Sequence, residues 1–95
     1  MSGAVRVEQQ GAWAQVVLSH PGKFNAMARG MWRELRAVFL ALQQQDGLRC
    51  VLINGSAGHF CSGGDISEYP DFRFDPTSLR AFHEDEVWGA LQAML

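Results

Sequence analysis

Hydrophobic and polar positions alternate in two short runs near the start of the chain. Residues 4–10 read AVRVEQQ and residues 12–19 read AWAQVVLS, with Gly11 between them. Two β-rich runs on either side of a glycine predict a hairpin over residues 4–19. The continuous Val-Val-Leu of the second run is typical of a strand covered on both faces.

The spacing changes to a helical period from residue 28 onward. Apolar residues recur at i, i+4, i+7, i+8 and i+11, and they are Met31, Leu35, Val38, Phe39 and Leu42. This single stripe predicts an amphipathic helix over residues 28–46 that ends at Asp46-Gly47. Ala28 cannot cap the helix, so we expect its start to fray or to use Asn25.

A short apolar run and a second helical segment follow. Residues 48–54 (LRCVLIN) predict a buried strand, and residues 55–69 form a glycine-rich loop. Asp75 followed by Pro76 has the form of an N-cap with proline at the first helical position, which predicts a helix over residues 76–95. The order strand, strand, helix, strand, loop, helix indicates an α/β fold with a βαβ crossover.

Composition narrows the class of protein. The 95 residues allow one domain at most, and 47% of them are hydrophobic, as in globular proteins. A formal charge of −2 gives no reason to expect nucleic acid as a partner, and no apolar run approaches the ~20 residues of a membrane span. The N-terminus lacks a secretion signal, so we expect a cytoplasmic location and two reduced thiols at Cys50 and Cys61.

The glycine loop allows several interpretations. Gly58 and Gly63 have the G-x-x-x-x-G spacing of a phosphate-binding loop, but Gly64 and Asp65 occupy the positions of the required Lys and Ser/Thr, which disfavours it. The glycines could simply turn the chain. Alternatively, a glycine after a strand exposes its backbone N–H to a ligand, and such a group can stabilise an oxyanion.

Two stretches, HPGKFNAM at 20–27 and VLINGSAGHFCSGGDISEY at 51–69, together resemble the enoyl-CoA hydratase/isomerase (crotonase) superfamily. The resemblance implies the crotonase-like ββα spiral of the ClpP/crotonase type, with residues 1–95 as an incomplete N-terminal portion. It implies a homo-trimer or hexamer for the complete protein. The family's second oxyanion N–H and its catalytic acids lie beyond residue 95, so we expect this chain alone to be inactive.

The resemblance also implies the ligand and its site. The ligand is an acyl-CoA thioester, with coenzyme A entering only as part of the substrate, and neither a permanent cofactor nor a metal is expected. Gly64 matches the residue whose backbone N–H holds the thioester oxygen. The implied substrate-binding residues, from the CoA loop 20–27 and the oxyanion loop 55–69, are Lys23, Phe24, Ala26, Ser62, Gly64, Asp65 and Ile66.

The reaction implied is hydration or isomerisation of an enoyl-CoA, and the alternative is an acyl-CoA-binding or structural module without catalysis. Many family hydratases have alanine at position 64, so Gly64 weakens the hydratase assignment but not the thioester assignment.

Other polar and aromatic residues have simpler expected roles. We expect Asp65 to bond backbone amides and fix the loop, and Glu68 to be solvated. We expect His20 to be a surface residue. Lys23 is either a plain loop charge or the partner of a CoA phosphate. For the polar run 83–86 we expect a solvated helix face, with the alternative that His83 or Trp88 lines the acyl pocket, and Trp32 is assigned to the core or a subunit contact.

Overall fold

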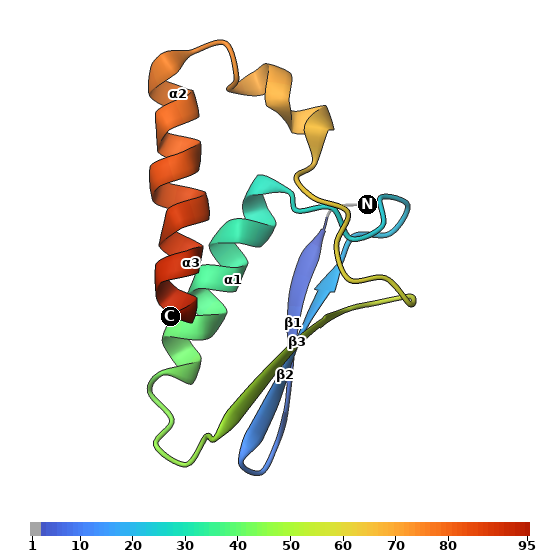
Figure 1. The fold of residues 1–95 in the computed structure, drawn as a ribbon, viewed down its shortest axis with the longest axis vertical. Coiled ribbons are helices and arrows are strands. Elements are labelled where there is room, and N and C mark those ends of the chain that lie inside the picture. Colours follow the sequence, from blue (N-terminus) through green and yellow to red (C-terminus); the bar gives the residue numbers. More distant parts are fainter. Residues whose placement is uncertain (1–2) are drawn as a thin grey trace.

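A three-stranded sheet with helices packed on one of its faces makes up the fold (Figure 1). The computed structural model describes residues 3–95, so the first two residues of the predicted 1–95 domain lie outside it. Strands β1 (Ala4–Gln10) and β2 (Trp13–Ser19) pair antiparallel, and β2 pairs parallel with β3 (Cys50–Gly55). The predicted hairpin is confirmed, and Gly11 turns it with a φ of 61°.

Helix α1 (Arg29–Leu42) packs its apolar stripe against the sheet. Its buried residues are Met31, Leu35, Phe39 and Leu42, and they meet Val5, Ala14, Val16 and Leu18 in one core. The helix ends four residues before the predicted end at residue 46, because residues 43–46 carry no apolar side chain to bury. The Gln43 amide instead donates to Ala93 O, 2.5 Å away, which ties this end of α1 to the last helix.

The C-terminal helical segment runs alongside α1 in the same direction (Figure 1, orange to red). It consists of α2 (Pro76–Ala81), a π-helical segment (Phe82–Val87) and α3 (Trp88–Met94), so the helix predicted over 76–95 is interrupted by a wider turn. Asp75 accepts hydrogen bonds from the N–H groups of Thr77 and Ser78, as an N-cap does. Within residues 3–95, no helix has the length and apolarity to cross a bilayer.

The expectation that residues 48–54 form a buried strand is wrong for one face of β3. This strand lies at the edge of the sheet, and the helices cover one face only. Val51 and Ile53 face the core and are partly buried, whereas Leu52 points to the other face and is 49% exposed. The sequence of β3 is apolar on both faces, but among residues 3–95 the helices pack against only one of them.

Candidate functional site

The loops of residues 20–27 and 55–65 lie against each other. An isolated parallel bridge joins Met27 and Gly64. Met27 N donates to Gly63 O at 2.7 Å, and Asp65 N donates to Met27 O at 3.0 Å. Ser62 N donates to Phe24 O at 3.1 Å. The structure thus brings together the two stretches that sequence reasoning had paired.

The backbone N–H of Gly64 is left without a partner by this arrangement. In a parallel bridge, Met27 bonds to the residues on either side of Gly64, so the Gly64 N–H points away from it. No acceptor among residues 3–95 bonds it, and Gly64 is only partly buried. A fixed, accessible N–H of this kind can donate to an oxygen atom of a ligand.

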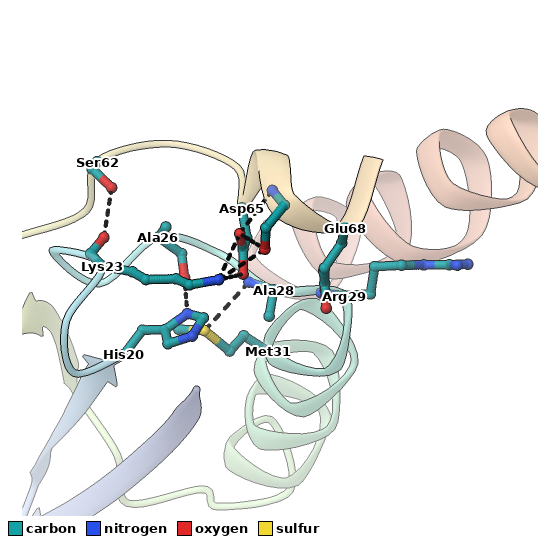
Figure 2. A network of polar contacts seen from close by, with 10 residues as sticks. His20, Lys23, Ala26, Ala28, Arg29, Met31, Ser62, Asp65 and Glu68 are labelled. Carbon is teal, nitrogen blue, oxygen red and sulfur yellow. Dashed lines mark hydrogen bonds and ion pairs between the residues drawn. The ribbon is translucent and has the colours of Figure 1, made fainter. Parts of the chain in front are cut away.

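Asp65 fixes the loop directly after Gly64 (Figure 2). Its side chain is 6% exposed and accepts from Ser67 N at 3.1 Å and from Ser67 Oγ at 2.6 Å. Lys23 Nζ lies 3.0 Å from Asp65 Oδ2. The Ser67 hydroxyl, followed by Lys23, holds the pKa of Asp65 below its usual value. The expectation that Asp65 fixes this loop is therefore confirmed, and the residue also caps the 3₁₀ helix Ile66–Asp71.

The Lys23 ammonium bonds to the loop that follows Gly64, and the side chain is also partly exposed to solvent. Its ammonium also donates to Ser67 Oγ at 2.8 Å, yet the side chain remains 42% exposed. The structure therefore gives Lys23 a role within the loop, and contact with a CoA phosphate stays a prediction.

Asn25 holds the loop in an unusual backbone conformation. Phe24 and Asn25 both have left-handed backbones, with φ of 51° and 59°, a strained choice for a residue as bulky as phenylalanine. The Asn25 side chain accepts from His20 N at 3.0 Å and donates to the carbonyls of Ser56 and His59, both at 2.9 Å. Sequence reasoning missed this role. The tolerance of asparagine for left-handed backbone was the available signal.

The remaining predicted binding residues divide into exposed and buried ones. Phe24 is 63% exposed, with its ring edge-on to His59 at 4.9 Å, and Ile66 is 76% exposed. Ser62 is exposed, and its hydroxyl donates to Lys23 O at 3.0 Å. Ala26 is 6% exposed, so it shapes the loop from within. A hollow of about 410 Å³ opens beside these residues, lined by Phe24, Gly58, His59, Phe60, Cys61 and Ser62.

His20 is buried, which corrects the expectation of a surface residue. It is 4% exposed, and its Nδ1 donates to Ala26 O at 2.8 Å. The loop 20–27 folds back over the ring because Asn25 and Ala26 both bond to His20.

Glu68 caps helix α1, which corrects the expectation of a solvated carboxylate. Its Oε1 accepts from Arg29 N, the first helical N–H, at 2.8 Å (Figure 2). Ala28 supplies no side-chain cap, and Asn25 is engaged in the loop. The cap therefore comes from a residue that lies 39 positions further along the chain.

Glu86 is also buried, although the polar run 83–86 was expected to be a solvated face. It is 9% exposed and bonds Arg29 Nη2 at 2.7 Å and Arg33 Nη2 at 2.9 Å. Burial alone would raise the pKa of Glu86, but the hydrogen bonds from Arg29 and Arg33 outweigh it, and the pKa lies below its usual value. The guanidinium of Arg29 also lies 4.8 Å from the centroid of the Phe72 ring.

A second hollow of about 270 Å³ lies between the 3₁₀ helix and the C-terminal helix. Its lining residues are Tyr69, Phe72, Arg73, Leu79, Phe82 and His83. His83 thus lines an aromatic pocket, whereas Trp88 is 48% exposed and lies outside it. Trp32 packs against the core. Cys50 and Cys61 are free thiols, and no group of three or more potential metal ligands gathers in residues 3–95.

Comparison with known proteins gives one consistent family. The sequence model described as enoyl-CoA hydratase/isomerase matches residues 13–88. An enoyl-CoA hydratase of Alternaria alternata is 26% identical over 87 residues, which cover 92% of this chain and 28% of that protein. The mitochondrial Delta(3,5)-Delta(2,4)-dienoyl-CoA isomerase of Mus musculus is 34% identical over 62 residues, or 65% of this chain and 19% of that protein.

A solved structure agrees in shape. The enoyl-CoA hydratase/carnithine racemase from Magnetospirillum magneticum superposes with a TM-score of 0.88 at 27% identity, over 94% of this chain and 33% of that one. The fold is therefore that of the crotonase type, as expected. The chain spans about a third or less of the length of these proteins.

Proposed function

Because the chain belongs to the enoyl-CoA hydratase/isomerase family, we propose that the complete gene product acts on an acyl-CoA thioester by stabilising its enolate. The free N–H of Gly64 is the observation that carries this proposal. It lies in a loop fixed on both sides by hydrogen bonds, so it need not reorganise when charge develops on the thioester oxygen. One such donor typically lowers a barrier by about 3 kcal/mol.

Coenzyme A would lie along the contact between the two loops. Phe24, Ser62 and Ile66 present exposed groups there, and Lys23 offers a half-exposed cation for a phosphate. Ala26 and Asp65 are buried and support the two loops from within. We propose the family's trimer or hexamer for the complete product, which its mass in solution would test.

Hydration of a 2-enoyl-CoA or isomerisation of its double bond is the reaction proposed, since relatives with both names match the chain. A non-catalytic acyl-CoA-binding module is the second candidate. It is favoured by the state of three carboxylates, because Asp65, Glu68 and Glu86 are all engaged within the protein. None of these three is free to act as a general base.

The experiment is an assay of the complete gene product with crotonyl-CoA and with a 3-enoyl-CoA, with binding of unreactive butyryl-CoA measured in parallel. Conversion of either substrate supports the enzyme, and butyryl-CoA binding without any turnover supports the binding module. If the complete gene product binds none of these CoA thioesters, both candidates are overturned.

A further inference from the structure

The hydroxyl of Tyr69 lies directly over Gly64. Its oxygen is 2.5 Å from the point that a Cβ atom at position 64 would occupy, so only glycine allows this approach without displacing the tyrosine. Tyr69 is the only tyrosine of the chain. Its hydroxyl makes no hydrogen bond with any of residues 3–95. Two donors without partners, the backbone N–H of Gly64 and the hydroxyl of Tyr69, therefore lie close to each other.

Their separation allows both to reach the same acceptor atom. A Cβ lies about 2.5 Å from the N of its own residue, by standard bond lengths. The Tyr69 oxygen is therefore within about 5 Å of Gly64 N. Two donors that each lie about 2.8 Å from one acceptor can be as much as about 5.6 Å apart, so a single oxygen can accept from both.

The ring that carries this hydroxyl is held in place from several sides. Its centroid lies 5.4 Å from the centroid of Phe72 and 6.3 Å from that of Phe82. The preceding residue, Glu68, is fixed by its hydrogen bond to Arg29 N. A donor held in this way loses little freedom when it binds a ligand.

We propose that Tyr69 Oη donates a hydrogen bond to the same thioester oxygen as the Gly64 N–H, and so acts as a catalytic residue in enolate stabilisation. The inference rests on the proposed function, because it takes the ligand to be an acyl-CoA thioester. It also gives a reason for glycine at position 64: an alanine methyl group would meet the tyrosine hydroxyl.

The test uses acetoacetyl-CoA, a thioester that ionises to an ultraviolet-absorbing enolate. Its apparent pKa when bound to the complete gene product is compared between the natural protein and Tyr69→Phe. We expect loss of the hydroxyl to raise this apparent pKa by about one unit, a tenfold loss of enolate, since a hydrogen bond to a charged group contributes about that much. Binding of butyryl-CoA, which forms no enolate under these conditions, should change less than threefold.

Two further variants complete the design. Phe74→Leu is the matched control, because it changes another aromatic residue a few positions after Tyr69 whose side chain is 82% exposed. It should leave the apparent pKa of bound acetoacetyl-CoA unchanged. Gly64→Ala should reduce enolate formation more in the natural background than in Tyr69→Phe, where the clash with the hydroxyl is removed. An enolate pKa unaltered or lowered in Tyr69→Phe would overturn the proposal. If the natural protein binds butyryl-CoA but forms no enolate, the proposed oxyanion site itself fails, and this inference fails with it.

Discussion

Lys23 links the two loops of the site and is the only lysine of the chain. In the complete gene product, we expect Lys23→Ala to weaken butyryl-CoA binding by about threefold to tenfold at low salt and by less at high salt. The reason is that an exposed cation next to a phosphate is screened by ions. Titration calorimetry at two salt concentrations measures both values.

Arg49→Ala provides the control for Lys23, because it also removes an exposed positive charge, next to the end of β3 that lies away from the two loops. It should leave binding unchanged at both salt concentrations. Equal affinities for Lys23→Ala and the natural protein would remove Lys23 from the CoA site, and its contacts with Asp65 and Ser67 would then be its whole role.

Glu68 offers a test that separates a structural carboxylate from a catalytic one. Because it caps α1 through Arg29 N, we expect Glu68→Gln to lower the free energy of unfolding by about 0.5–1 kcal/mol while kcat changes less than twofold. Denaturant unfolding and steady-state assays of the complete gene product measure the two quantities. A large fall in kcat with unchanged stability would instead make Glu68 a general acid or base.

At the scale of elements, Glu86 joins the π-helical segment to α1 through Arg29 and Arg33. The pKa of Glu86 is lower in the folded protein than its usual 4.5. The ion pairs of Glu86 with Arg29 and Arg33 therefore stabilise the fold above that pH, and this stabilisation is lost as the pH falls through the lower folded pKa. We therefore expect Glu86→Gln to lower the melting temperature at pH 7, and the difference from the natural protein to shrink below about pH 4.

Glu84→Gln is the matched control for Glu86, since Glu84 is 66% exposed and, among residues 3–95, forms an ion pair only with Arg80 of the same C-terminal helical segment. Its melting temperature should follow that of the natural protein at every pH. A difference between Glu86→Gln and the natural protein that persists unchanged at acid pH would show that packing, and not the charge of Glu86, supports the junction.

Local patterns were sufficient to predict most elements. The hairpin followed from alternation around Gly11, α1 from its apolar stripe, and the cap of the last helix from Asp75-Pro76. The sequence pattern could not show contacts between distant segments, such as the Glu68 cap. The π-helical segment was missed for the same reason, because burying Glu86 against two arginines of α1 is a tertiary effect.

For the candidate site, too, local motifs could be predicted from the sequence, whereas contacts between distant residues could not. Similarity of the loop motifs led to Gly64 and Asp65, and the structure shows the Gly64 N–H free and Asp65 bonded within the loop. The tie made by Asn25 and the approach of Tyr69 to Gly64 could not be predicted, because each depends on the path of a loop in space rather than on spacing.

At the scale of the whole molecule, residues 3–95 form a thin and open body. The radius of gyration is 14.0 Å, compared with about 12–13 Å for a compact domain of this length. A groove of about 790 Å³ runs between the helices and β3, and its apolar lining includes Phe39, Leu42, Leu48, Val51, Ile53 and Met94. On the opposite face of the sheet, Leu52 is 49% and Trp13 37% exposed.

This amount of exposed apolar surface leads to a prediction for residues 1–95 expressed alone. We expect that polypeptide to bind a hydrophobic dye more strongly per molecule than the complete gene product, and to self-associate in sedimentation experiments, because large apolar patches drive association. It should convert no crotonyl-CoA, since Asp65, Glu68 and Glu86 are all engaged within the protein. A monomer with low dye binding and measurable turnover would contradict this, and would mean that Gly64 and its neighbours suffice for catalysis.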